Sequence, residues 1–286
     1  MRAAAAASRR PQRRRRTTRR VCRSSASRRG PASEVGPGHS KSAHGSGSGP
    51  AKPTVVLVHG DWADASGWSG VIARLQDDGY TVVAPPNPLR SLSGDAAYIR
   101  TYLDTLTGPI VLVAHSYGGA VITNAATGDP NVRALVYVDA FIPDQGQNTL
   151  DLAGPDSALS ADPTTIFKFV PATLPPTPST DLYLKTSTFL KDFANGLPES
   201  EARILAATQR PATLAQAEPS GVPAWRTIPS WALIGTQDHI IPPAAEQGMA
   251  EHAGATISYF NAGHLGLISD PKTVTRLIER AAKATG

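Results

Sequence analysis

The stretch IVLVAHSYGGAVI, residues 110–122, decides the expected fold. Its first half is an apolar, β-branched run, which predicts a strand buried on both faces. Its second half passes through Ser116 into helix-forming residues, and a strand that turns into a helix at a serine is the context of a nucleophile elbow. Ala114 and Gly118 stand two positions before and after Ser116. Both are small, as this tight turn requires, although Ala114 replaces the more usual glycine.

The same strand and helix patterns recur on both sides of this stretch. Strand patterns occupy residues 54–60, 81–85, 109–115, 134–141, 230–238 and 256–260. Helical patterns lie between them at residues 66–78, from Asp95 to 106, 118–127, 243–252 and from Asp270 to about 283. We expect Asp95 and Asp270 to cap their helices. Strands alternating with helices of this length predict an α/β fold with a mostly parallel sheet flanked by helices.

Two segments depart from this alternation. Residues 142–229 are rich in proline and carry short amphipathic pieces, so we expect an inserted helical cap within a single α/β domain spanning residues 53–286. Residues 1–52 consist mainly of Arg, Ser, Ala, Gly and Pro, which offer too little apolar surface to offset the entropy of ordering. This tail is expected to be disordered.

The charge of the chain is divided by position. Residues 1–50 carry 13 basic side chains and one acidic side chain, a net +12, whereas residues 51–286 carry 15 basic and 22 acidic ones, a net −7. The sequence therefore predicts an acidic domain with a basic tail. Contact with nucleic acid or an anionic membrane is expected only through that tail, and the alternative is a tail without function.

The composition of the chain argues against several other classes of protein. Cys22 is the single cysteine, so neither an intrachain disulfide nor a cysteine-based metal site can form. No run approaches the 18 or so apolar residues of a membrane helix, and no apolar segment follows the basic start as in a secretory signal. We therefore expect a cytoplasmic protein. We also expect no metal, because no histidine or carboxylate cluster has ligand spacing.

A serine hydroxyl becomes a good nucleophile only when a base accepts its proton, and that base must be oriented by an acid. His264 stands in a loop after the last strand, and Asp238 follows the strand 230–238. Both positions lie at the carboxyl edge of a parallel sheet, where they can reach Ser116. Asp139, at the end of the preceding strand, competes for the role of the acid, but its apolar surroundings favour Asp238. The order Ser, Asp, His is that of one hydrolase fold.

The segment HGDW, residues 59–62, follows the first strand and supplies the remaining candidates. Gly60 allows close backbone approach, so the N–H of Asp61 can join that of Tyr117 in an oxyanion hole. Gly60 and Trp62 are also candidates for contacting the substrate. His59 is expected to be a structural hydrogen-bonding residue.

These motifs, together with GTQDHIIP and AGHLGLISDP, resemble those of the α/β-hydrolase superfamily. The similarity is greatest to small cap-bearing esterases grouped with plant methylesterases, hydroxynitrile lyases and bacterial pyrethroid-type carboxylesterases. It implies Ser116 as nucleophile, Asp238 as acid and His264 as base, and no cofactor. Hydroxynitrile lyases of this group carry a Lys where this chain has Leu265 and a Thr where it has Gly60, which disfavours lyase activity.

The expected function is therefore that of a serine hydrolase acting on small carboxylic esters. Epoxide hydrolases and haloalkane dehalogenases are excluded because they use an Asp where this chain has Ser116. Two alternatives keep the same triad: a cofactor-free haloperoxidase or perhydrolase, and a ligand-binding receptor.

Overall fold

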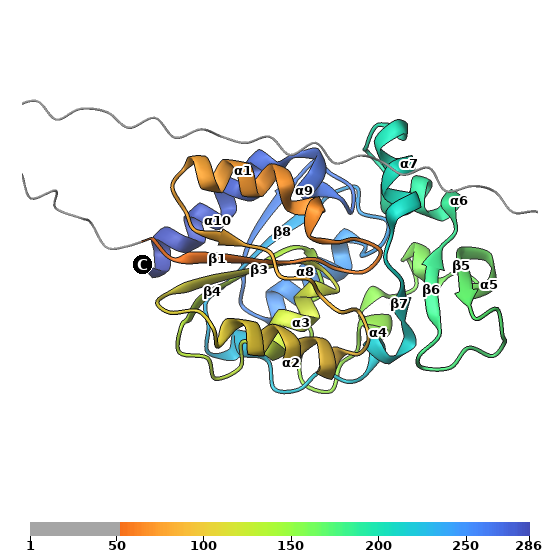
Figure 1. Ribbon diagram of the computed structural model, residues 1–286, viewed down its shortest axis with the longest axis horizontal. Helices are drawn as coiled ribbons and strands as arrows, with labels where there is room; N and C mark the ends of the chain where they lie inside the picture. Colours follow the sequence, from red (N-terminus) through yellow and green to blue (C-terminus); the bar gives the residue numbers. More distant parts are fainter. Residues whose placement is uncertain (1–51) are drawn as a thin grey trace, which may run out of the picture. The chain divides into compact units, whose positions relative to one another are not determined.

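Six strands form one parallel sheet in the computed structural model, which describes residues 52–286. In their order across the sheet they are β2 (Val82–Val83), β1 (Thr54–Val58), β3 (Ile110–Ser116), β4 (Val132–Ala140), β8 (Ser230–Gly235) and β9 (Thr256–Phe260). Every residue of β3 is buried, because this strand lies inside the sheet and helices cover both of its faces. The predicted α/β fold is confirmed (Figure 1).

Helices cover both faces of the sheet, as Figure 1 shows, with α1 and α10 on one face and α2 and α3 on the other. The helices outside the insertion are α1 (Ser69–Asp77), α2 (Leu92–Leu103), α3 (Gly118–Ala125), α8 (Pro243–His252), α9 (Gly266–Ser269) and α10 (Pro271–Thr285). Asp270 caps α10 as predicted, since its Oδ1 accepts a hydrogen bond from the Thr273 N–H at 3.1 Å.

One predicted helix start is wrong. Helix α2 begins at Leu92, and its cap is Ser91, whose hydroxyl accepts a hydrogen bond from the Gly94 N–H at 3.1 Å. Asp95 lies within the first turn of the helix and is fully buried. Its carboxylate accepts hydrogen bonds from the Arg90 N–H and from the Tyr117 hydroxyl, so its role is tertiary rather than that of a cap.

The chain between β4 and β8 forms the insertion, which Figure 1 shows at the end of the sheet where the strands finish. Its elements are α4 (Thr149–Ala153), α5 (Pro163–Ile166), β5 (Phe167–Val170), β6 (Asp181–Leu184), α6 (Thr186–Thr188), α7 (Glu199–Thr208) and β7 (Ala212–Thr213). The three strands pair antiparallel in a small sheet that the sequence analysis did not predict. Strands of two to four residues are too short to show a period.

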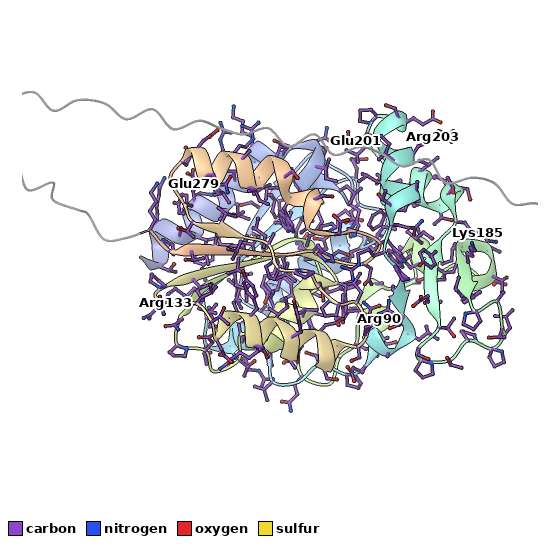
Figure 2. The ribbon with its side chains drawn as sticks, viewed as in Figure 1. Arg90, Arg133, Lys185, Glu201, Arg203 and Glu279 are labelled. Carbon is purple, nitrogen blue, oxygen red and sulfur yellow. The ribbon has the colours of Figure 1, made fainter. Side chains whose placement is uncertain are left out.

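Arg90 ties the insertion to the α/β core. Its guanidinium donates to Asp181 Oδ1 at 2.7 Å and to the carbonyl of Pro211 at 3.2 Å, and its own carbonyl accepts from the Thr213 hydroxyl at 2.7 Å. Figure 2 labels Arg90 where the core meets the insertion. These contacts join β6 and β7 to the segment before α2.

The strand order places a switch point between β1 and β3. From β1 the chain moves outward to β2, and it then returns to the other side of β1 to form β3. Ligands of open α/β sheets bind at the carboxyl ends of the strands at such a point. Gly60 lies in the segment after β1 and Ser116 is the last residue of β3, so the fold brings the two predicted site motifs together.

The remaining expectations concern the basic tail and the absence of a membrane-spanning helix. The predicted disorder of residues 1–52 and the role of the basic tail fall, apart from Lys52, outside the described residues. Within residues 52–286, no helix combines the length and apolar character needed to cross a bilayer.

Candidate active site

Ser116 ends β3 in a strained conformation. Its φ is +55°, in the left-handed region that a side chain with a Cβ rarely adopts. Among residues 52–286, three further non-glycine residues have positive φ, and two of these, Trp62 and Asp139, also adjoin the carboxyl ends of the central strands. Strain that clusters in this way points to a functional site.

Glycines let neighbouring backbones approach the serine. A Cβ on Gly60 would lie 2.5 Å from the Cβ of Ser116 and 3.0 Å from the backbone nitrogen of Tyr117. A Cβ on Gly118 would lie 2.7 Å from the carbonyl oxygen of Val58. The loop after β1 therefore packs directly against the turn after β3, and only glycine fits at the contact.

The three predicted side chains meet although they are far apart in the sequence. The Ser116 Oγ lies 2.9 Å from His264 Nε2, and His264 Nδ1 lies 2.7 Å from Asp238 Oδ2. The side chains of His264 and Asp238 are completely buried. This is the relay of hydroxyl, imidazole and carboxylate that a serine nucleophile requires.

Backbone amides hold Asp238 in place. Its Oδ1 accepts hydrogen bonds from the N–H groups of Ile240 and Ile241, at 2.7 and 3.0 Å. These bonds come from the loop directly after β8, so the segment GTQDHIIP orients its own carboxylate. The Oδ2 atom is left to accept from the imidazole.

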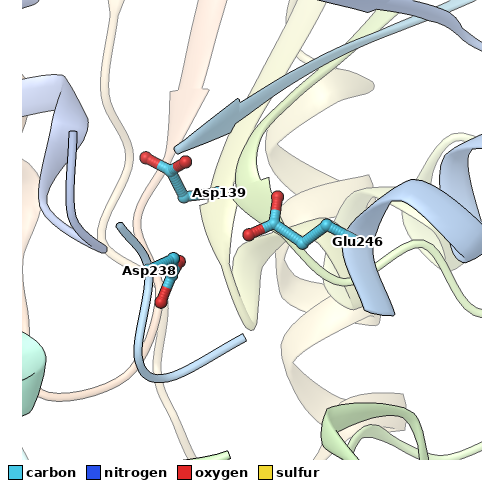
Figure 3. Close-up of side chains that lie close together, drawn as sticks. All are labelled: Asp139, Asp238 and Glu246. Atoms are coloured by element: carbon cyan, nitrogen blue, oxygen red, sulfur yellow. The ribbon is translucent and has the colours of Figure 1, made fainter. Parts of the chain in front are cut away.

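Asp139, the competing acid, takes another position. Its Oδ1 accepts from the Gly235 N–H at 2.7 Å, and its Oδ2 has no hydrogen-bond partner among residues 52–286. Figure 3 shows Asp139, Asp238 and Glu246 close together, with their nearest ligand oxygens all within 4.8 Å of one another. Glu246 comes from α8, and the sequence analysis did not single it out.

Burial raises the pKa values of two of these three carboxyl groups. Burial, with the nearby charge of Asp238, raises the pKa of Asp139 well above its ordinary range. Burial and the neighbouring carboxylates raise the pKa of Glu246 in the same direction. Both oxygens of Asp238 are already used by the amides and the imidazole. Burial therefore favours the protonated forms of Asp139 and Glu246 beside Asp238.

The other histidines of the site make backbone contacts. His59 Nδ1 donates to the Gly60 carbonyl at 2.9 Å, and its Nε2 accepts from the Asn87 N–H at 3.0 Å. Burial lowers the pKa of His59 to about 4, so this imidazole is neutral at pH 7. His115 Nε2 donates to the His264 carbonyl at 2.7 Å, which anchors the backbone of His264.

The insertion holds the residues that follow Gly60. The Asp61 Oδ1 accepts from Gln216 Nε2 at 2.7 Å, and the Trp62 Nε1–H donates to the carbonyl of Leu182 at 2.9 Å. Burial, opposed by the hydrogen bond from Gln216, raises the pKa of Asp61 to about 7. Phe193 of the insertion packs against His264, with the two ring centroids 5.1 Å apart.

Three of these residues were missed in the sequence. Gln216 had one local signal, because Thr213 and Gln216 have the spacing of a capping box. That box forms, and the Thr213 N–H donates to Gln216 Oε1 at 2.6 Å. Glu246 and Phe193 had no signal, because their roles arise from packing across elements.

Comparison with known proteins agrees with this architecture. Residues 55–277 match the sequence pattern described as the Alpha/beta hydrolase family. The chain belongs to the α/β-hydrolase family. The resemblance found in the sequence motifs is therefore confirmed. Ser116 stands where β3 passes into α3.

Individual relatives of this α/β-hydrolase carry esterase and hydrolase names. A carbendazim-hydrolyzing esterase of Nocardioides sp. (strain SG-4G) is 34% identical over 110 residues, which are 34% of this chain and 46% of that protein. The match thus spans about half the length of the first curated relatives.

Two solved structures share the fold over nearly their whole length. Polyneuridine aldehyde esterase superposes with a TM-score of 0.67 at 20% identity, covering 80% of this chain and 98% of that one. A pyrethroid hydrolase from Sphingobium faniae JZ-2 superposes with a TM-score of 0.63 at 19% identity, covering 81% of this chain and 98% of that one.

Proposed function

We propose that this α/β-hydrolase cleaves carboxylic esters of small molecules through an acyl-enzyme formed on Ser116. The observation that carries the proposal is the pair of hydrogen bonds from Ser116 Oγ to His264 Nε2 and from His264 Nδ1 to Asp238 Oδ2, at 2.9 and 2.7 Å. The esterase and hydrolase names of the relatives support the same class of reaction.

The first half of the reaction forms the acyl-enzyme. The Ser116 Oγ attacks the ester carbonyl carbon while His264 Nε2 takes the hydroxyl proton. The Asp238 carboxylate stabilises the imidazolium that results. The N–H groups of Asp61 and Tyr117 donate to the oxyanion of the tetrahedral intermediate. When the intermediate collapses, His264 returns the proton to the departing alkoxide, which leaves as the alcohol.

The second half releases the acid. Water attacks the acyl carbonyl carbon, His264 Nε2 takes a proton from it, and the bond to Ser116 Oγ breaks as that oxygen regains a proton. Phe193 and Trp62 limit the access of bulk water to the base, because both are buried beside the site. A drier site strengthens the hydrogen bonds to the oxyanion.

The test compares Ser116→Ala with Ser93→Ala, an exposed serine on α2. We expect Ser116→Ala to abolish cleavage of 4-nitrophenyl acetate and labelling by a fluorophosphonate probe, and Ser93→Ala to leave both unchanged. Urea unfolding establishes that each variant is folded. Unchanged turnover in Ser116→Ala would overturn the proposal.

Assays of the wild-type protein also distinguish the two alternatives, a perhydrolase and a ligand-binding receptor. Peroxide-dependent halogenation in acetate buffer that exceeds ester cleavage would support a perhydrolase using the same triad. Tight ligand binding with turnover slower than minutes would support a receptor.

A further inference from the structure

A cavity of about 90 Å³ lies between the insertion and the core of this hydrolase. Its wall is mostly apolar and includes Phe141, Leu150, Phe167 and Leu182. Among the residues that line it, all within the described part of the chain, Asp61 is the single ionisable one. A short apolar group of a substrate fits this cavity, and the Asp61 carboxyl offers it a polar contact.

Two of the residues that line this cavity, Asp61 and Phe141, lie close to Ser116, one through its chain neighbour and the other through the backbone. Asp61 follows Gly60, which packs against Ser116, and the Phe141 N–H donates to the Ser116 carbonyl at 3.2 Å. A substrate with its carbonyl carbon at the Ser116 Oγ can therefore place its acyl or its alcohol group here.

The orientation of the Asp61 carboxyl is fixed by the insertion. Because the Thr213 N–H donates to Gln216 Oε1 at 2.6 Å, the amide of Gln216 must turn its Nε2 toward Asp61 Oδ1, 2.7 Å away. An ionised carboxylate can accept about four hydrogen bonds. Within residues 52–286, the Asp61 side chain takes part in this one hydrogen bond, so acceptor capacity remains at the cavity wall.

We propose that Asp61 determines specificity by accepting a hydrogen bond from an N–H or O–H donor on the substrate group that occupies this cavity. The substrate class is then a small ester whose acyl or alcohol group is short, largely apolar and carries one such donor. The inference rests on the proposed ester hydrolysis. It assigns the Asp61 side chain a role separate from that of its backbone N–H in the oxyanion hole.

The charged neighbours are compatible with this role. Loss of solvent raises the pKa of Asp61, and the charge of Asp95 acts in the same direction, whereas the hydrogen bond from Gln216 and the charge of Arg90 oppose the rise. Ionising a carboxyl group that has lost solvent costs free energy. A hydrogen bond donated by the substrate offsets part of that cost.

The experiment uses two pairs of esters that differ by exchange of N–H for CH₂. The acyl pair is the 4-nitrophenyl ester of N-acetylglycine and that of 4-oxopentanoic acid. The alcohol pair is the butanoate of N-(2-hydroxyethyl)acetamide and that of 5-hydroxypentan-2-one. kcat/KM is measured for the full chain and corrected for the uncatalysed rate. We expect the N–H ester to be preferred roughly 10- to 100-fold in at least one pair.

The variant Asp61→Asn tests the residue. Its amide oxygen remains opposite Gln216 Nε2, so its NH₂ group faces the cavity and offers a donor in place of an acceptor. We expect the preference for the N–H ester to disappear or reverse, a ratio that is independent of any general loss of rate. A preference that persists in a folded Asp61→Asn would overturn the assignment.

Failure of the inference differs from failure of the proposed function. Ratios near one in both pairs for the wild-type protein, with cleavage that depends on Ser116, would overturn only the role of Asp61. Absence of Ser116-dependent cleavage for all four esters and for 4-nitrophenyl acetate would overturn both.

Discussion

The assignment of the acid can be tested by a matched pair of substitutions, Asp238→Asn and Asp139→Asn. Each replaces one carboxyl group of the same buried cluster by an amide of nearly the same size and shape. In Asp238→Asn the amide oxygen stays with the two backbone N–H donors of the following loop, and the NH₂ group then faces His264 Nδ1. The imidazole must accept there, which puts its proton on Nε2, where it can no longer take the proton of Ser116.

The wrong tautomer costs about 10⁴-fold in kcat, which corresponds to about 5.4 kcal/mol of activation free energy. Asp139→Asn keeps its oxygen on the Gly235 N–H and has no bond to the base, so its kcat is expected to stay within about tenfold of wild type. The assay is 4-nitrophenyl acetate hydrolysis, with urea unfolding to establish the fold of each variant. A loss in Asp139→Asn equal to or larger than that in Asp238→Asn would refute the assignment of Asp238.

Three further predictions concern stability and the oxyanion loop. Burial raises the pKa of Glu246 above its unfolded value of 4.5, so the stability that its protonated form contributes falls as the pH rises toward the folded pKa. Relative to wild type, Glu246→Gln should therefore become more stable between pH 5 and pH 8, by at most about 1.4 kcal/mol per pH unit. A difference in the free energy of unfolding in urea that is the same at both pH values would contradict this. Gly60→Ala should lower kcat about 10²–10³-fold by displacing an oxyanion donor, whereas the control Gly67→Ala, whose Cβ would be 3.7 Å from its nearest neighbour, should stay within a few-fold. Trp62→Phe, which loses the bond to the Leu182 carbonyl, should lower the free energy of unfolding by about 1 kcal/mol, and an unchanged denaturation midpoint would argue against that contact.

Local patterns in the sequence predicted most of the sheet and the candidate triad. The strand 256–260 and the helix 243–252 have the predicted bounds, because each is a single uninterrupted pattern. Ser116 ends a strand, and Asp238 and His264 each follow one. Because parallel strands end at one edge of the sheet, the convergence of these residues follows from topology.

Elements whose signals were short or ambiguous were predicted less well. Asp95 has the chemistry of a helix cap, yet the preceding Ser91 takes that role and leaves Asp95 to receive the Tyr117 hydroxyl. The small sheet of the insertion was missed because its strands are brief and separated by proline-rich segments.

The sequence by itself determined the parallel sheet, the serine-centred turn and the order of the three candidate catalytic residues, because these depend on neighbours along the chain. Only the tertiary structure decided that Glu246 joins the two aspartates and that Gln216 binds Asp61. The partners in these contacts lie on different elements, and their effect comes from the exclusion of water between packed surfaces. Burial of that kind raises the pKa values of the carboxyl groups, and no run of adjacent residues encodes it.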